Sequence, residues 1–367
     1  MRRATITGWG RCVPPAVLTN SDLATVMDTS DDWISTRTGI KERRISHTET
    51  SDMAAVAGRH ALAAAGLEPE QIDLLIVATC TPDRLIPSAA SYVQTKLGAT
   101  AAACLDVNAA CSGFVYGLAI ANGMIATGGF NRILLIGAER LSMLLDAEER
   151  STAVLFGDGA GAVVIEPAQG DDGVLAVTLG TDGALADKLT VAGFGTERTV
   201  GGDEELFKLV MDGQEIFRHA VTRMGESATK VADEAGLELE ELDLLIPHQA
   251  NTRIIDATAR RLKMPYEKVF LNIASYGNTS AASIPIALSE AIELGRVRPG
   301  ANLVMVAFGG GLTWGAVALR FADRVTPLAM STAALPPTDK TGLELFAEVQ
   351  EERRRRRGAP PAKSGRG

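Results

Sequence analysis

Short runs of apolar residues alternate along the chain with longer segments in which apolar positions recur at a helical period. Runs of this length and composition are typical of strands buried on both faces of a sheet. Four of them form two pairs, at residues 74–79 and 133–137 and at residues 244–249 and 303–308. Helical patterns precede the first run of each pair, over residues 54–65 and 219–235. This alternation of strands and helices predicts an α/β fold.

The two pairs belong to an internal repeat. Residues 65–76 read AGLEPEQIDLLI and residues 235–246 read AGLELEELDLLI, so nine of twelve positions are identical at an offset of 170 residues. Solenoid repeats are far shorter than this. We therefore expect a duplicated domain with two similar α/β halves, over residues 1–170 and 211–322. Functional side chains are then expected at the junction, where strand ends from both halves meet.

Two stretches fall outside the repeat. Residues 171–210 are a connecting segment whose TDG, GFGTE and VGGDEE motifs are typical of loops with short elements. Residues 323–367 contain prolines, a short helical pattern at 343–352 and five consecutive arginines, with nine basic and six acidic side chains in all. We expect this extension to be a mobile appendage. The arginine run could bind an anion, but a solvated tail is the simpler interpretation.

Charge and composition exclude several classes of protein. The chain has 367 residues with 36 Lys+Arg against 45 Asp+Glu, a formal net charge of −9, which argues against nucleic-acid partners. The apolar run at 109–125 is too short for a bilayer and predicts a buried helix rather than a membrane partner. The N-terminal residues lack the apolar core of a signal peptide, so we expect a cytoplasmic protein with reduced thiols.

The cysteines are spaced too irregularly for a zinc site or a disulfide framework, at Cys12, Cys80, Cys104 and Cys111. Cys111 differs from the others because DVNAACSGF places it between a predicted strand and an apolar helix. Free N–H groups and the dipole at a helix N-terminus lower the pKa of a thiol, so we expect an activated nucleophile. A lone cysteine is also commonly a buried structural residue, and that alternative stays open here.

Two polar side chains of the second half could face Cys111. His248 follows directly after a predicted strand in IPHQAN, and Asn278 precedes an apolar helix in YGNTSAAS, as Cys111 does in the first half. An amide donates hydrogen bonds without titrating, and an imidazole does so when neutral. Taken singly, His248 could be a hydrogen-bonded core histidine and Asn278 a capping or turn residue.

Three glycines follow a predicted strand in FGGGLTWG, at residues 308–315, and free backbone N–H groups there could bind an oxyanion. The other glycine-rich motif, FGDGAG at residues 156–161, lacks the spacing of a phosphate loop and predicts tight turns. A cysteine, a histidine and an asparagine with a glycine-supplied oxyanion hole are more specific together than singly. The combination predicts acyl transfer through a thioester.

The motifs DVNAACSGF, IPHQAN, YGNTSAAS and FGGGLTWG resemble the signatures of β-ketoacyl-[acyl-carrier-protein] synthase III, a condensing enzyme of the thiolase fold. The resemblance covers residues 3–322 and includes DDWISTRTGIKERRI near the N-terminus. It implies that the two α/β halves form a five-layer α-β-α-β-α core, that the protein is a homodimer, and that no metal, nucleotide or flavin cofactor takes part.

The resemblance also implies a reaction. Cys111 would take an acyl group from acyl-CoA, and His248 and Asn278 would assist decarboxylation of malonyl-acyl carrier protein. The resulting carbanion would attack the acyl-cysteine to give a 3-oxoacyl-acyl carrier protein, initiating fatty acid synthesis. The backbone N–H groups of Cys111 and Gly310 would hold the tetrahedral oxyanion.

Substrate contacts are implied position by position. Trp33 and Arg150 resemble the pair that sandwiches the adenine of CoA, while Arg37 and Asn251 match positions near its phosphates and pantetheine arm. A basic set is expected to dock the acidic carrier protein, although each member could equally lie on a solvated helix face: Arg218, Arg253, Arg260 and Arg261.

Ile86 and Phe217 match positions of the acyl pocket. Ile86 stands where some relatives carry a phenylalanine that reaches into the partner subunit, so its smaller volume predicts room for branched or longer starters.

Three alternatives remain at this point. A relative from specialised metabolism could make a polyketide starter or transfer an acyl group without decarboxylation. A hydroxymethylglutaryl-CoA synthase-like enzyme would need a glutamate base near the cysteine, and its motifs differ. A non-catalytic subunit usually lacks the nucleophile, so the presence of Cys111 argues against that role.

Overall fold

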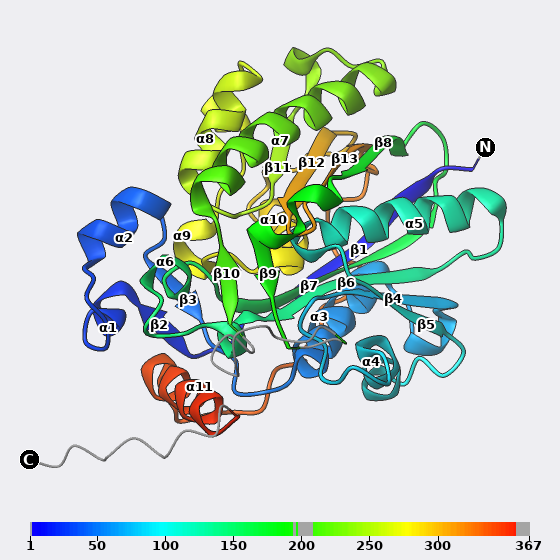
Figure 1. The fold of residues 1–367 in the computed structure, drawn as a ribbon. Coiled ribbons are helices and arrows are strands. Elements are labelled where there is room, and N and C mark those ends of the chain that lie inside the picture. The colour runs from blue at the N-terminus through cyan, green and yellow to red at the C-terminus, as the bar shows by residue number, and fades with distance from the viewer. Residues whose placement is uncertain (1, 194–195, 197–207, 357–367) are drawn as a thin grey trace, which may run out of the picture.

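The computed structural model describes residues 2–193, 196 and 208–356 (Figure 1). Two mixed sheets form its framework. The first has the strand order β1 (Ala4–Cys12), β7 (Asp158–Pro167), β6 (Ile133–Arg140), β4 (Leu74–Ala78) and β5 (Ala103–Val107). The second has the order β11 (Leu244–Pro247), β12 (Asn302–Gly309), β13 (Thr313–Arg320) and β8 (Gly173–Thr181).

The duplication predicted from the repeat is visible in the strand register. Strands β4 and β6 are parallel with Leu74 opposite Ile133, and β11 and β12 are parallel with Leu244 opposite Leu303. Each strand of the second pair therefore lies 170 residues after its counterpart in the first pair. In each sheet the next strand is antiparallel, β7 in the first and β13 in the second.

One boundary differs from the expectation. β8 pairs antiparallel with β13 and so belongs to the second half, whereas the sequence assigned it to the connecting segment 171–210. It was missed because it is an edge strand with half-exposed side chains and lacks a long apolar run. The rest of that segment contains β9 (Leu189–Val191), which pairs with β10 (Leu209–Met211). Residues 194–195 and 197–207 lie outside the described part.

Helices cover the sheets in layers, as Figure 1 shows. α3 (Thr50–Ala65) and α4 (Ala89–Leu97) pack on the outer face of the first sheet. α7 (Gly213–Ala235) and α8 (Thr252–Arg261) pack on the outer face of the second. α5 (Gly113–Thr127) and α10 (Ser283–Glu293) lie between the sheets. This is the expected five-layer α-β-α-β-α arrangement of the thiolase fold.

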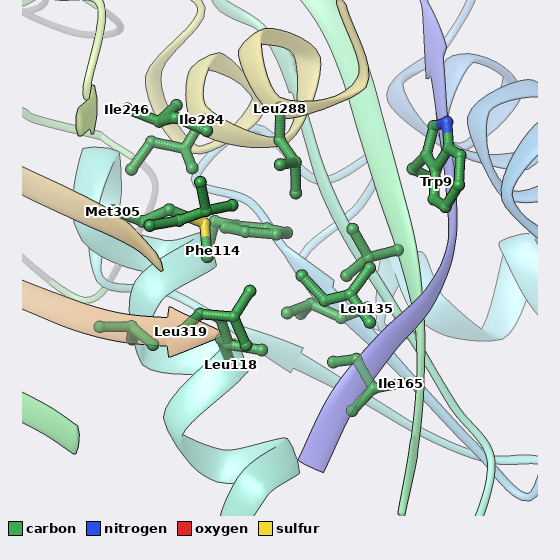
Figure 2. Close-up of a cluster of buried hydrophobic side chains, with 14 of the residues drawn as sticks. Trp9, Phe114, Leu118, Leu135, Ile165, Ile246, Ile284, Leu288, Met305 and Leu319 are labelled. Carbon is green, nitrogen blue, oxygen red and sulfur yellow. The ribbon is translucent and has the colours of Figure 1, made fainter. Parts of the chain in front are cut away.

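The middle layer carries the largest core cluster (Figure 2). Phe114 and Leu118 of α5 meet Ile284 and Leu288 of α10 between side chains of both sheets. Within the described residues, only 110–127 combine the length and hydropathy of a membrane span. Because its side chains fill this core, the segment is the buried helix that the sequence predicts.

Smaller elements complete the description. β2 (Val17–Thr19) pairs with β3 (Glu42–Arg44) beside two short helices, α1 (Asn20–Leu23) and α2 (Asp31–Thr38). Two further short helices are α6 (Arg150–Ala153) and α9 (Ile273–Tyr276). The 3-10 helices are η1 (Pro69–Gln71), η2 (Ala110–Ser112), η3 (Leu141–Leu144), η4 (Gly183–Lys188), η6 (Leu239–Glu241), η7 (Tyr266–Lys268) and η8 (Ser280–Ala282).

The C-terminal extension packs against the body through residue 356, which corrects the expectation of a mobile appendage for that part. The backbone N–H groups of Leu328 and Ala329 donate to carbonyls at the end of α3. α11 (Gly342–Arg356) then buries Leu345, Phe346 and Val349. The surrounding charges obscured this apolar face in the sequence. Residues 357–367, including the last arginine of the run, lie outside the described residues.

Removing a core side chain from the middle layer should destabilise the whole fold. Leu118 is fully buried, so Leu118→Ala should lower the free energy of unfolding by about 2–5 kcal/mol. Leu294 is 65% exposed, and Leu294→Ala should change it by less than about 0.5 kcal/mol. Urea denaturation of both variants measures the difference, and equal losses would contradict this assignment of the core.

Candidate active site

Each half places a 3-10 helix immediately before its central helix, η2 before α5 and η8 before α10. The first residues of these two elements, Ala110 and Ser280, are 170 positions apart and have left-handed backbones with φ of 46° and 48°. A non-glycine residue in this region costs about 1–3 kcal/mol and is found most often at functional sites. The duplication has therefore kept a strained turn in both copies, and Cys111 lies directly after one of them.

Cys111 is only 6% exposed. Burial raises the pKa of its thiol to about 12, and a hydrogen bond from Ser280 opposes the rise only in part. The shift is thus opposite to the expected lowering of the thiol pKa, because the loss of water around the sulfur outweighs the hydrogen bond from Ser280. At neutral pH the thiol is protonated before substrate binds.

His248 follows β11 and is 2% exposed. Burial lowers the pKa of its imidazole to about 3, so the ring is neutral at physiological pH. Its Nδ1 lies 2.7 Å from the Ser283 hydroxyl oxygen, which itself accepts the backbone N–H of Gln249 at 3.4 Å. With that oxygen accepting from Gln249, the hydroxyl proton is available to Nδ1. The arrangement favours the tautomer with its proton on Nε2.

Asn278 is held by backbone and side-chain contacts that orient its amide. Its backbone N–H donates to Leu155 at 2.9 Å, and its carbonyl accepts from Gly157 at 3.0 Å. The side-chain oxygen accepts the N–H of Ser280 at 2.8 Å. Because the oxygen is engaged in the turn, the NH₂ group remains as the donor of this side chain.

The glycine-rich loop comes very close to the nucleophile. A Cβ at Gly309 would lie 2.6 Å from the backbone nitrogen of Cys111, so only glycine fits. The Thr313 hydroxyl lies 2.9 Å from the carbonyl oxygens of Ala109 and Gly310, which ties the loop to η2. This contact brings the FGGG backbone beside the cysteine, as expected of an oxyanion hole.

Two cavities meet at Cys111. The larger, about 470 Å³, is lined by Cys111, His248 and Asn278 and reaches Trp33 and Arg37 at its other end. The smaller, about 420 Å³, is lined mainly by apolar side chains, among them Leu141, Leu144, Phe156, Leu189 and Leu209. A long substrate arm and an acyl chain could thus meet at one sulfur from opposite sides.

The indole of Trp33 lies between two guanidinium groups. Arg37 is 4.6 Å and Arg150 is 4.4 Å from the ring centroid. Arg150 also donates to the carbonyl of Asp28 at 2.6 Å. Both arginines make cation–π contacts with the indole, an arrangement that a planar ligand could enter.

Asn251 caps a helix and contacts the Arg37 backbone. Its side-chain oxygen caps α8 by accepting the N–H of Arg253 at 2.8 Å, and its amide donates to the carbonyl of Arg37 at 3.2 Å. It also lines the larger cavity. Its expected contact with CoA therefore stays a prediction.

The four predicted docking arginines, Arg218, Arg253, Arg260 and Arg261, are all exposed on α7 and α8. Two have acidic neighbours, with Arg218 2.7 Å from Glu215 and Arg261 3.8 Å from Glu226. Arg253 lines the larger cavity and lies over the ring of Phe217. The set thus extends from the cavity mouth along two helices.

Of the two predicted acyl-pocket residues, the structure of one chain bears only on Phe217. Phe217 lines the larger cavity rather than the smaller one, because α7 passes the cavity mouth. Ile86 lines neither cavity and is 82% exposed, in a loop between β4 and α4. Its expected contact lies on another subunit and is therefore not tested by one chain.

Sequence reasoning missed a buried carboxylate behind the nucleophile. Glu139 of β6 is fully buried and accepts hydrogen bonds from Thr79, Thr81 and Cys80 of the first half. It also accepts from Ser280 of the second half at 3.0 Å, which links the loop after β4 to the second turn. Burial raises the pKa of its carboxyl. A charged residue directly after the apolar run ILLIGA was the available signal.

The raised pKa of Cys111 can be tested by alkylation. With a pKa of about 12, the thiolate fraction should rise tenfold per pH unit, so the rate of iodoacetamide labelling should climb between pH 7 and 9 without levelling. Peptide mass spectrometry can follow Cys111 alone. The same peptide in urea should level off near the ordinary thiol pKa of about 8.5. A plateau below pH 8 in the folded protein would show that the helix terminus outweighs burial.

Comparison with known proteins gives the family. The model of 3-oxoacyl-[acyl-carrier-protein (ACP)] synthase III matches residues 105–183, and that of its C-terminal part matches residues 232–321. Beta-ketoacyl-[acyl-carrier-protein] synthase III 2 of Vibrio cholerae is 50% identical over 353 residues, covering 96% of this chain and 98% of that protein. Such a match necessarily extends into the residues beyond 321.

Solved structures agree. The 3-oxoacyl-[acyl-carrier-protein] synthase III of Aquifex aeolicus has a TM-score of 0.82 at 49% identity, covering 87% of this chain and 100% of that chain. The priming β-ketosynthase of the R1128 polyketide pathway has a TM-score of 0.83 at 35% identity, covering 88% of this chain and 97% of that one. Taken with the cavity that joins Cys111, His248 and Asn278, these similarities lead to one conclusion: the chain belongs to the β-ketoacyl-[acyl-carrier-protein] synthase III family of condensing acyltransferases.

Proposed function

We propose that this enzyme condenses an acyl-CoA starter with malonyl-acyl carrier protein to give 3-oxoacyl-acyl carrier protein, the initiating step of fatty acid synthesis. The observation that carries the proposal is the larger cavity. Its lining joins Cys111, His248 and Asn278 to the Trp33–Arg37 pair at the other end. A nucleophile, two neutral hydrogen-bond donors and a stacking site for a nucleotide thus share one channel.

Acylation would begin with CoA in the larger cavity and its acyl chain in the smaller one. The Cys111 sulfur attacks the thioester carbonyl, the bond to the CoA sulfur breaks, and the thiol proton leaves on CoA. The N–H groups of Cys111 and Gly310 stabilise the intermediate oxyanion. Because the thiol is protonated before binding, its proton departs within the complex, and the resting enzyme is protected from nonspecific reagents.

Decarboxylation would depend on neutral donors. As the malonyl carboxylate leaves as CO₂, electron density moves to the thioester oxygen, where His248 Nε2–H and the Asn278 NH₂ group donate. The lowered pKa of His248 keeps the ring neutral, and the Ser283 contact at Nδ1 favours the tautomer with its proton on Nε2. The enolate carbon then attacks the acyl-cysteine carbonyl and releases the Cys111 thiolate. No cofactor is required, since acyl-CoA is a substrate.

Further parts of the proposal concern partners and location. Arg253 lines the larger cavity and the other exposed arginines lie along α7 and α8, which suits an acidic carrier protein delivering its arm there. β5 is an edge strand of the first sheet, and Leu85 and Ile86 nearby expose apolar side chains. An open strand edge beside apolar side chains supports a homodimer, with Ile86 reaching the partner's acyl cavity. We place the enzyme in the cytoplasm.

Priming of a polyketide pathway is the second candidate function. The structural likeness to the R1128 priming ketosynthase, at 35% identity, favours it. Both functions use the same chemistry and differ in the starter. Room left by Ile86 would admit branched or longer chains, and strict acetyl-CoA preference in a substrate panel would refute that idea.

The nucleophile is tested by replacing it. Mixed with a panel of acyl-CoAs, the wild type should gain one acyl mass that Cys111→Ala does not gain. Cys12 is the matched control, because burial raises its pKa to about 12 as well but it lines neither cavity at Cys111. Cys12→Ala should therefore acylate normally. Intact-protein mass spectrometry measures the adducts, and acylation of Cys111→Ala would overturn the assignment.

The donors are tested by separating the two half-reactions. His248→Ala and Asn278→Ala should still form the acyl adduct but release CO₂ from malonyl-acyl carrier protein about 10²–10³-fold more slowly, the usual loss for one oxyanion donor. His60→Ala, on the outer helix α3, should match the wild type. Adduct formation without any CO₂ release in the wild type would favour an acyltransferase that does not decarboxylate.

A further inference from the structure

The C-terminal helix α11 contacts the wall of the smaller cavity from outside. Figure 1 shows α11 in red beside β2, far along the chain from it. Its buried side chains join one apolar cluster with Leu141, Leu144 and Leu145, from η3 and the residue after it. Leu141 and Leu144 also line the cavity next to Cys111. This short segment therefore has the smaller cavity on one side and α11 on the other.

Polar contacts from α11 hold three consecutive residues of this segment, two through their backbone and one through its side chain. The Gln350 side chain donates to the carbonyl of Leu145 and accepts the N–H of Ala147, both at 3.0 Å. One turn later, Arg353 lies 3.4 Å from the carboxylate of Asp146. Both partners of this ion pair are buried, with 6% and 11% of their side chains exposed. Removing one partner of a buried ion pair lowers the stability of a protein by several kcal/mol, so this pair couples the segment tightly to the helix.

The body of the protein also holds the beginning of the same segment. The Asp158 carboxylate accepts the N–H and hydroxyl of Ser142 at 2.8 and 2.7 Å. From Leu145 to Ala147, Gln350 and Arg353 of α11 add their contacts to the local hydrogen bonds of the turn. Three residues further on, Arg150 stacks on Trp33 at the other cavity. α11 therefore acts midway between the acyl cavity and the stacking site.

The helix is itself firmly placed. Thr341 and Glu344 form reciprocal hydrogen bonds at its N-terminus, and a Cβ at Gly342 would overlap the backbone of β2. The family model ends at residue 321, so α11 lies outside the part that carries the chemistry. A rigid helix outside the catalytic core that packs against the wall of the smaller cavity can affect which substrates fit there without taking part in the reaction.

We propose that α11 braces residues 141–147 and thereby sets the depth of the acyl cavity, with Gln350 and Arg353 as positioning residues for starter selection. The inference rests on the proposed function, since it assigns the smaller cavity to the acyl chain. Without these two side chains, residues 145–147 would lose their polar contacts to α11, and the cavity wall at Leu141 and Leu144 could yield to longer chains. Discrimination between starters should then weaken while the chemistry at Cys111 remains.

Adjacent arginines provide a matched test. Arg353 is buried against Asp146, whereas Arg354 is exposed and lies 3.3 Å from Glu351 of its own helix. We would measure kcat/KM for Cys111 acylation across straight-chain acyl-CoAs. In Arg353→Ala, the value for a chain two carbons beyond the preferred one should rise about tenfold relative to the preferred one, the discrimination that a methylene in an apolar pocket carries. Arg354→Ala should keep the wild-type profile.

Gln350→Ala is the milder variant, and it keeps the test valid where Arg353→Ala folds poorly. Hydrogen exchange should rise in the peptide covering 141–150 in both variants. A uniform fall in kcat/KM across all chain lengths would mean a purely structural role and overturn the brace. A different result would overturn the proposed function itself. If the wild type forms no adduct with any acyl-CoA, both the proposed function and the brace are wrong.

Discussion

The active site depends on backbone contact between the two halves, and glycine makes that contact possible. A Cβ at Gly137 of β6 would overlap the carbonyl oxygen of Ala281, and one at Gly161 of β7 would lie 2.5 Å from the nitrogen of Ile286. Gly309 of β12 meets the backbone of Cys111 in the same way. These residues bring the two central helices against the opposing sheets. The strand ends of both halves can then supply one reaction centre.

Burial at this junction determines the chemistry as much as residue type does. It keeps the Cys111 thiol protonated and the His248 ring neutral, each by removing water from the charged form. Neutral donors suit an enolate that forms and disappears during one turnover, because they stabilise it without retaining a charge. The Ser283 hydroxyl orients the His248 ring, and the Glu139 carboxylate holds the Ser280 side chain in place.

Much of this could be read from the sequence, and the failures have physical causes. The repeat at an offset of 170 residues predicted the duplicated domain. Its strands could be recognised because buried strands appear in the sequence as continuous apolar runs. The motifs around Cys111, His248 and Asn278 predicted the site residues, because their spacing within the repeat places them at strand and helix ends. The direction of the Cys111 pKa was wrong, because solvent exclusion is a tertiary property. β8 and α11 were misjudged because edge strands and charged amphipathic helices reveal little until their partners are known.

The paired left-handed turns at Ala110 and Ser280 have an evolutionary consequence. Cys111 follows the first turn, and at the same offset Ala281 follows the second. After duplication, one copy kept a reactive side chain, while in the other a methyl group packs into the wall of its sibling. The second turn therefore serves as scaffolding: its Ser280 hydroxyl donates to Glu139 of the first half, beside the turn that carries the reactive cysteine.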